Sequence, residues 1–378
     1  MKKWLAALLV AGFCILPAHA EVAGAPEVTA GAAVLMEKET GEVLYALNPH
    51  DKLEPASVTK VMTLLLTMEA IQAGTLSVED TVQVSARAAS MGGSQVYLKE
   101  GEVMSVHDLL KAVAVASGND AAVALAERLS GSESAFVERM NQRAHELGME
   151  DTTFMNCTGL PAPGHLTSAY DIAVMSRELI RNHPQIREYT TIWMDSLRDG
   201  AFQLANTNKL IRFYDGATGL KTGSTDAAQF CISATAERDG MELIAAIMKS
   251  PTKDTRTATA KSMLDFGFAN YTVLDVKPAQ ALAPVEVLLG ERGFVQPILA
   301  DSGRILVEKA QINEVETTVS LAPDVEAPVA AGQKLGEVTV TVAGEVRQTI
   351  PIVAAEEVPR LTVFGIYREL LREFFMVK

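Results

Sequence analysis

The sequence is poor in the residues that build disulfide frameworks and metal centres. Only three of its 378 residues are cysteine, and its six histidines are scattered along the chain. Because no Cys/His cluster has the spacing of a metal site, we expect neither a metal ion nor another cofactor. Cys157 and Cys231 lie beyond the N-terminal leader described below. Their number permits one disulfide or two buried thiols, and the sequence leaves both open.

Basic residues are also in short supply. The chain has 33 Lys and Arg against 47 Asp and Glu, which gives a formal net charge of −14. This acidic balance argues against nucleic acid as a partner. Hydrophobic residues make up 48% of the chain and charged residues 21%, as is typical of globular proteins. The length predicts two or three domains.

The N-terminal apolar run is too short to cross a membrane, which takes ~20 residues. Lys2 and Lys3 precede this run, which covers 5–17, and Ala18-His19-Ala20 supplies a small-x-small cleavage site. This is the pattern of a secretory signal peptide over residues 1–20, with a retained anchor as the alternative. Cleavage would remove two lysines and no acid, so the mature net charge becomes −16.

Residues 21–271 show the mixed patterns of an α/β domain, in which an antiparallel sheet flanks a helical block. Helices are predicted over 58–73, 107–115, 120–129, 133–147, 168–181 and 255–268. Strands are predicted over 33–36, 43–45, 219–224, 230–236 and 241–248, with Asp239-Gly240 as a hairpin turn.

The composition changes after this domain. Residues 272–353 consist of short Val-rich runs between Pro, Gly and Asp turns, which predicts a small all-β domain with the form of a sandwich. Residues 354–359 are predicted as a linker. In 360–378, seven apolar residues recur on one face of a helix: Val363, Phe364, Tyr367, Leu370, Leu371, Phe374 and Phe375. We expect this amphipathic helix to lie on a membrane surface, with docking on the β domain as the alternative.

The first chemical motif is Ser57-Val58-Thr59-Lys60. Ser57 stands where a helix begins, so the plainest interpretation is an N-cap. Lys60 shares its helix face and could accept the Ser57 proton if its pKa, ordinarily about 10.4, fell by ~3 units. The apolar residues after Lys60 predict that it is desolvated, which lowers a lysine pKa.

Ser250-Pro251-Thr252-Lys253 matches the same spacing. Pro251 at the first helical position and the charged residues that follow predict a solvated helix cap. We therefore expect Ser57, rather than Ser250, to be the nucleophile.

Two further motifs complete the set. Ser117-Gly118-Asn119 falls between two helices, where Asn119 or Asp120 could simply cap the second helix; functionally, Ser117 could relay a proton and Asn119 could hold a substrate amide. Lys221-Thr222-Gly223 falls in a strand, where Gly223 would allow a ligand backbone to approach closely and the other two side chains suit a carboxylate. The backbone N–H groups of Ser57 and Ser224 are candidates for an oxyanion hole.

With these three motifs in this order, the chain resembles the serine D-alanyl-D-alanine carboxypeptidases, the low-molecular-mass penicillin-binding proteins. The resemblance covers nearly the whole chain and is closest to members from Gram-positive, spore-forming bacteria. It also extends over Met91–Gln95, Ala116–Ala121, Asn206–Leu210 and Gly219–Gly240.

The resemblance implies Ser57 as acylated nucleophile and Lys60 as general base. It implies Ser117 and Asn119 as relay and substrate-holding pair, with Lys221 and Thr222 on the substrate carboxylate. The implied reaction removes the last D-alanine from a peptidoglycan pentapeptide through an acyl-enzyme, with β-lactams as inhibitors. It also implies an exported enzyme that acts at the outer face of the cytoplasmic membrane.

One position departs from the pattern, and three rival functions stay open. Thr207 occupies a site where some family members carry arginine, so carboxylate binding is expected to rest on Lys221, Thr222 and Ser224. A class A β-lactamase usually has aspartate where this chain has Gly118, and its glutamate would have to be Glu178, inside a predicted helix. A D,D-endopeptidase or transpeptidase shares the motifs, and a non-enzymatic wall-binding protein would not need them.

Overall fold

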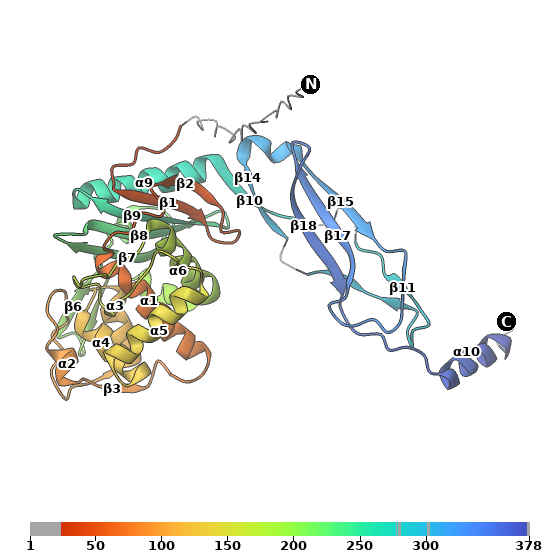
Figure 1. Ribbon diagram of the computed structural model, residues 1–378, viewed down its shortest axis with the longest axis horizontal. Helices are drawn as coiled ribbons and strands as arrows, with labels where there is room; N and C mark the ends of the chain where they lie inside the picture. Colours follow the sequence, from red (N-terminus) through yellow and green to blue (C-terminus); the bar gives the residue numbers. More distant parts are fainter. Residues whose placement is uncertain (1–23, 277, 279–280, 301–302, 376–378) are drawn as a thin grey trace, which may run out of the picture.

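The computed structural model describes residues 24–375 except 277, 279–280 and 301–302; the predicted signal peptide, 1–20, lies outside them. Figure 1 shows a compact α/β body, an elongated β-rich domain beside it, and a helix at the far end of that domain. The α/β body and the β-rich domain agree with the predicted fold class.

The centre of the α/β body is a five-stranded antiparallel sheet. Its order is β2 (Val43–Leu47), β1 (Ala32–Glu37), β9 (Met241–Ser250), β8 (Gln229–Arg238) and β7 (Ala217–Thr225). The predicted hairpins and the turn at Asp239-Gly240 are confirmed, since Arg238 pairs with Met241. Strand β7, which carries the third motif, ends up at the edge of the sheet.

Alternating side chains of the sheet belong to two separate cores. On β1, Val34 and Met36 pack with the helical block, whereas Ala33 and Leu35 pack on the opposite face with α9 (Lys253–Asn270). This follows from the two-residue period of a strand, which sends successive side chains to opposite faces. Figure 1 shows α9 across the sheet from the block.

The helical block lies in the sequence between β2 and β7. Its helices are α1 (Lys60–Gln72), α2 (Ala86–Ala89), α3 (Val106–Ala114), α4 (Asn119–Ser130), α5 (Glu133–Glu146), α6 (Ala169–Asn182), α7 (Arg187–Thr190) and α8 (Leu210–Phe213). Two small hairpins interrupt it: β3 (Thr81–Gln83) with β4 (Val103–Ser105), and β5 (Met194–Leu197) with β6 (Phe202–Ala205).

Capping side chains fix where several of these helices begin. The hydroxyls of Ser105, Ser132 and Ser168 each accept a hydrogen bond from a backbone N–H of the first turn that follows. The two chemical motifs do not follow this rule. Ser57 lies inside a 3-10 turn (Ala56–Thr59) that precedes α1, and Gly118 is the N-cap of α4. The capping interpretations of Ser57, Asn119 and Asp120 are therefore wrong.

The second domain consists of β-strands, as predicted, with one 3-10 turn (Lys309–Glu314) between two of them. Its strands are β10 (Tyr271–Asp275), β11 (Val285–Leu288), β12 (Phe294–Val295), β13 (Pro297–Leu299), β14 (Arg304–Glu308), β15 (Val315–Leu321), β16 (Asp324–Glu326), β17 (Lys334–Val342) and β18 (Glu345–Ala354). They form sheets of order β10-β14, β12-β11-β16 and β13-β18-β17-β15 around two apolar cores.

The segment predicted as a linker makes specific contacts with this domain. Val358 is buried and exchanges backbone hydrogen bonds with Val329, and Leu361 N donates to the carbonyl of Leu289. The chain is thus held on the β domain as far as Leu361. Only after that residue does it leave, as helix α10 (Val363–Phe375).

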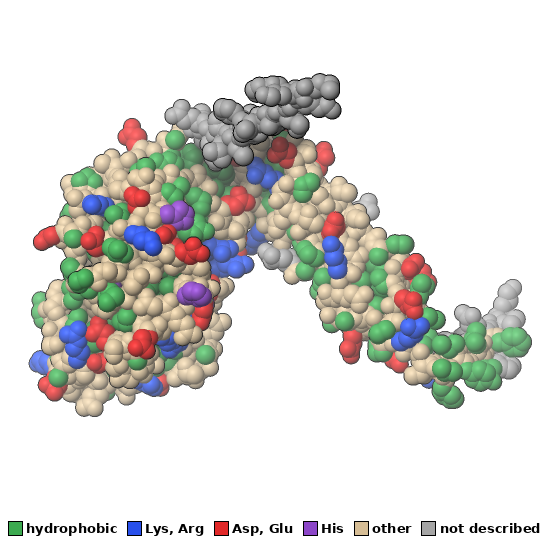
Figure 2. All heavy atoms as spheres, viewed as in Figure 1, with side chains coloured by type: hydrophobic (Ala, Val, Ile, Leu, Met, Phe, Trp, Pro, Cys, Tyr) green, Lys and Arg blue, Asp and Glu red, His purple; other side chains and the backbone are tan. Residues whose placement is uncertain are grey.

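Helix α10 keeps its apolar side chains in the open. Phe364 is 77% exposed and Leu370 61%, and Figure 2 shows a green apolar cluster at this end of the molecule. The alternative in which this face docks on the β domain is therefore not what the structure shows. In the described part of the chain, no helix has both the length and the apolar character needed to cross a membrane.

Candidate active site

Ser57 and Lys60 meet at the junction between the 3-10 turn and α1. Lys60 Nζ lies 3.0 Å from Ser57 Oγ, a hydrogen-bond distance, as their three-residue spacing predicts. Two further oxygens bind the same nitrogen: Asn119 Oδ1 at 2.6 Å and the carbonyl of Thr158 at 2.8 Å. Lys60 thereby joins α1, α4 and the loop before α6.

Lys60 is completely buried, and this burial lowers its pKa to about 7. The negative charge of Asp120 opposes the shift without reversing it. The predicted desolvation of Lys60 is therefore present in the structure. A lysine with this pKa is partly neutral near pH 7 and can accept the proton of a neighbouring hydroxyl.

The turn that carries Ser57 is braced by a chain of hydrogen bonds. Ala56 holds a positive φ of 47°, which is costly for alanine. His165 Nδ1 accepts from the Met155 N–H, so His165 Nε2–H donates to Thr59 Oγ1, which donates to the Ala56 carbonyl. Burial lowers the pKa of His165 to about 4, so the imidazole is neutral at pH 7 and serves as a brace.

Two glycines let neighbouring segments reach this turn. A Cβ on Gly159 would lie 1.8 Å from the Ala56 carbonyl oxygen, and one on Gly223 would lie 2.8 Å from Ser57 N. Strand β7 and the 158–160 loop therefore press directly on the nucleophile's turn. At Gly223 the close neighbour is the turn of Ser57 itself, and the approach of a ligand backbone stays a prediction.

The second motif brings Ser117 and Asn119 to the same place. Ser117 Oγ is buried and has no hydrogen-bond partner in the described part of the chain. Asn119 accepts from Lys60 and donates its Nδ2–H to the carbonyl of Gly92 at 2.6 Å. The Asp120 carboxylate accepts from Val96 N, which holds the 91–98 segment against the start of α4.

The third motif lines the other side. Lys221 is 1% exposed, and its Nζ donates to the Thr222 carbonyl at 2.7 Å. Burial lowers the pKa of Lys221 well below its usual value, and the charges of Lys60 and Arg256 add to this effect. The lowered pKa of Lys60 is caused chiefly by the burial of Lys60 itself, and not by the positive charge of Lys221. Thr222 Oγ1 donates to Thr207 Oγ1 at 2.7 Å, so Thr207 supplies a hydroxyl to the cleft.

A cleft unites the three motifs and contains two cations that the sequence analysis missed. Its lining residues are Ser57, Ser94, Ser117, Thr207, Thr222, Gly223, Ser224, Lys253 and Arg256. Arg256 is 3% exposed, its Nη1 donates to the Cys231 carbonyl at 3.4 Å, and its Nε has no partner in the described part of the chain. A buried guanidinium with so few acceptors is suited to bind an anion.

The second serine-x-x-lysine match has a different geometry. Ser250 is the buried last residue of β9 and donates to the Thr29 carbonyl. Thr252 caps α9, so the prediction that Pro251 occupies the first helical position is wrong. Lys253 begins the helix and lies at the active cleft, whereas Ser250 does not line it.

Two other sequence hypotheses are settled by contacts. Glu178 lies in α6 and pairs with Arg143 at 2.6 Å, away from the three acceptors of Lys60. Cys157 and Cys231 are both buried and free. Among the described residues, no group of three or more His, Cys, Asp or Glu side chains could hold a metal ion.

Comparisons with known proteins agree with this geometry. Residues 19–252 match the family described as D-alanyl-D-alanine carboxypeptidase (peptidase S11). The chain belongs to this family. Residues 275–360 match the C-terminal domain of penicillin-binding protein 5. The D-alanyl-D-alanine carboxypeptidase DacF of Bacillus subtilis is 43% identical over 88% of this chain and 86% of its own, in line with the predicted resemblance to spore-formers.

Solved structures of the family share the fold. Penicillin-binding protein 5 from Haemophilus influenzae superposes with a TM-score of 0.79 at 30% identity, over 89% of this chain and 99% of that one. Penicillin-binding protein D2 from Listeria monocytogenes, in its ampicillin-bound form, gives 0.59 at 33% identity, over 64% and 98%. Nearly all of this second structure is matched, but it covers a smaller share of the present chain, so it resembles only one part of the chain.

We predict that acylation by benzylpenicillin depends on pH through Lys60. Because the pKa of Lys60 is lowered to about 7, its neutral form grows as pH rises, and the acylation rate should rise with it and level off above pH 8. Stopped-flow measurement between pH 5.5 and 8.5 tests this, with circular dichroism as a control for folding. A rate that stays flat over this range would contradict the assignment.

Proposed function

We propose that this protein removes the terminal D-alanine from peptidoglycan stem pentapeptides through an acyl-enzyme on Ser57. The observation that carries the proposal is the 3.0 Å contact between Ser57 Oγ and the fully buried Lys60 Nζ. A neutral Lys60 takes the Ser57 proton while Oγ attacks the carbonyl of the penultimate D-alanine. The N–H groups of Ser57 and Ser224 donate hydrogen bonds to the carbonyl oxygen and stabilise the negative charge that develops on it.

The second half of the reaction reuses the same groups. Ser117, whose hydroxyl has no partner in the described structure, passes a proton from Lys60 to the departing D-alanine nitrogen. The carbon–nitrogen bond breaks and the peptide remains as an ester on Ser57. Lys60 then activates a water that cleaves the ester, which frees the shortened peptide and restores the hydroxyl. Asn119 keeps Lys60 in place throughout.

Strand β7 orients the substrate. It is the edge strand of the sheet, so an extended peptide can pair with it. The terminal carboxylate then lies at Thr222 with Arg256, while Lys221 lies behind them. Arg256 thus supplies the guanidinium that is missing at Thr207, although it comes from α9.

The contacts favour this reaction over two of the rivals, the class A β-lactamase and the wall-binding protein. The three acceptors of Lys60 are a hydroxyl, an amide oxygen and a backbone carbonyl, so the glutamate-directed water of a class A β-lactamase has no counterpart among them. A non-enzymatic wall-binding protein would not need a lysine kept near pKa 7. Penicillin would acylate Ser57 in the same way and leave a slowly hydrolysed adduct.

We also propose an exported, membrane-associated enzyme. Residues 1–20 would be removed as a signal peptide, 21–271 would form the catalytic domain, and 272–353 the β-rich domain. The exposed apolar side chains of α10 would lie in the outer surface of the cytoplasmic membrane. Figure 1 shows the β-rich domain between this helix and the catalytic body, where it would act as a spacer.

Ser57→Ala is expected to abolish both labelling by fluorescent penicillin and release of D-alanine from a muramyl pentapeptide. Ser250→Ala is the matched control, because it removes the serine of the second serine-x-x-lysine match, which does not line the cleft. It should keep both activities. Mass spectrometry of the products distinguishes loss of one alanine from cross-linking or internal cleavage, and labelling of the Ser57→Ala protein would contradict the assignment.

Arg256→Gln is expected to lower kcat/KM for a D-Ala-D-Ala peptide about 10- to 100-fold, because a hydrogen bond to a charged group contributes ~1.5–3 kcal/mol. A peptide with an amidated C-terminus should be hydrolysed slowly and show little difference between the two proteins. Lys253→Gln, at the exposed start of α9, should have a smaller effect that weakens with salt. Equal losses on both peptides would argue against carboxylate binding by Arg256.

A chain that ends at Leu361 is expected to keep its activity and to lose binding to vesicles that contain anionic lipid. The cut falls after the last backbone contact with the β domain, so the fold should survive. Vesicle flotation of the mature proteins measures binding. Full-length protein with Phe364→Asp and Leu370→Asp should behave like the truncation, and flotation of either protein would contradict anchoring by α10.

A further inference from the structure

Exposed apolar side chains gather in the hairpin formed by β11 and β12. Leu288 is 43% exposed, Leu289 45% and Phe294 62%. Phe294 pairs with Glu286, two residues before Leu288, so Leu288 and Phe294 lie on the same face of this sheet. The opposite face belongs to an apolar core, to which it contributes Val285, Val287 and Val295. The hairpin thus supplies a core on one face and presents apolar surface to the outside on the other.

The backbone of Leu289 adds to this observation. Its φ is 58°, in the left-handed region that leucine seldom adopts. The strained backbone presents a large apolar side chain to solvent, so two local costs meet at one residue without a matching gain in packing. Strain of this kind points to a surface with a function.

The same hairpin holds the chain just before α10. Leu361 N donates to the Leu289 carbonyl at 2.8 Å. One residue, Thr362, separates this contact from Val363, where α10 begins. Figure 1 shows β11 at the end of the β-rich domain from which α10 leaves. Because consecutive Cα atoms are only about 3.8 Å apart, a surface on which α10 lies must also come close to the hairpin.

The charged side chains around the hairpin largely offset one another. Arg292 forms an ion pair with Glu356 at 2.6 Å, and Arg360 forms one with Glu326 at 3.0 Å. Glu291 has no ion pair in the part of the chain that the structure describes. The hairpin therefore has no excess of positive charge with which to bind a polyanion, and what it offers a partner is apolar contact.

We propose that the β11–β12 hairpin is a second membrane contact, in which Leu288, Leu289 and Phe294 enter the boundary between lipid headgroups and acyl chains beside α10. The inference rests on the proposed membrane association and adds to it a contact made by a different element. Two contacts joined by so short a connection fix the tilt of the β-rich domain over the bilayer. They thereby set the height of the catalytic cleft above the membrane.

The first test measures the affinity of the mature full-length protein for vesicles of phosphatidylcholine and phosphatidylglycerol. The double variant Leu289→Ser and Phe294→Ser is expected to bind about 10-fold more weakly, the loss for two half-inserted apolar side chains. Because the contact is apolar, the loss should persist at high salt. Penicillin labelling of the double variant should stay unchanged, since both side chains are exposed and far along the chain from the catalytic motifs.

Val346→Ser is the matched control. Val346 is 64% exposed at the start of β18, whereas Ala354, at the end of this strand, pairs with Pro297 beside the hairpin. The control therefore removes an exposed apolar side chain from the same domain, eight residues along the strand from the hairpin. It should bind like the wild type. An equal loss in Val346→Ser, or no loss in the double variant, overturns the proposal.

The second test places the hairpin in the bilayer with brominated lipid, which quenches tryptophan only where it reaches the acyl chains. Phe294→Trp should lose much of its added emission on brominated vesicles, and Val346→Trp should keep it. Trp193, which is present in both proteins, cancels in the comparison. Quenching of both added tryptophans, or of neither, overturns the proposal.

The outcomes also separate this contact from anchoring by α10. If the wild-type protein does not float with vesicles, anchoring and the hairpin contact both fail. If it floats while Phe294→Trp is not quenched, only the hairpin contact fails. Sedimentation without lipid covers the remaining occupant: a dimer that the double variant dissociates would assign this face to a second copy of the chain and overturn the proposal.

Discussion

The buried Lys60 ammonium is the interaction on which the rest of the site depends. Three chain segments far apart in the sequence each give it one oxygen, at 2.6, 2.8 and 3.0 Å. Removing a cation from water is costly unless its hydrogen bonds are replaced, so these segments must be placed accurately. The same burial brings the pKa of Lys60 to about 7. Stability and chemistry therefore make competing demands on one side chain.

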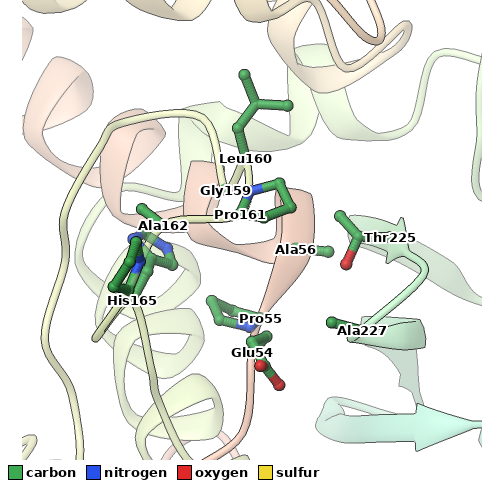
Figure 3. Close-up of a pocket in the computed structure, with 11 residues that line it drawn as sticks. Glu54, Pro55, Ala56, Gly159, Leu160, Pro161, Ala162, His165, Thr225 and Ala227 are labelled. Atoms are coloured by element: carbon green, nitrogen blue, oxygen red, sulfur yellow. The ribbon is translucent and has the colours of Figure 1, made fainter.

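The packing around the nucleophile explains how this accuracy is achieved. Gly159 and Gly223 let two backbone segments contact the Ser57 turn. His165 supports the turn through its hydrogen bond with Thr59, which in turn binds the Ala56 carbonyl. None of these groups reacts. They confine the 3-10 turn, with its positive φ at Ala56, to one conformation. This turn borders the catalytic cleft through Ser57, and Ala56 lines a second cavity beside it (Figure 3).

The sequence predicted most of the fold because its strands and helices carry clear periodicity, and the three motifs predicted where Ser57, Lys60, Ser117, Asn119 and Lys221 converge. It could not predict Arg256, which reaches the cleft because α9 packs beside β8. Nor could it predict that Thr158 binds Lys60, because the contact is made by a backbone carbonyl, which every residue type has. The serine-x-x-lysine spacing at Ser250 failed as a signal because the strand extends through that residue.

The burial of Cys157 and Cys231 determines how reactive their thiols are. Cys157 and Cys231 are buried and unpaired, and burial raises the pKa of both thiols. Since the thiolate is the form that reacts, disulfide exchange and oxidation at these sites are slow. The fold therefore does not depend on a bond between these two cysteines, and their thiols are protected from oxidation.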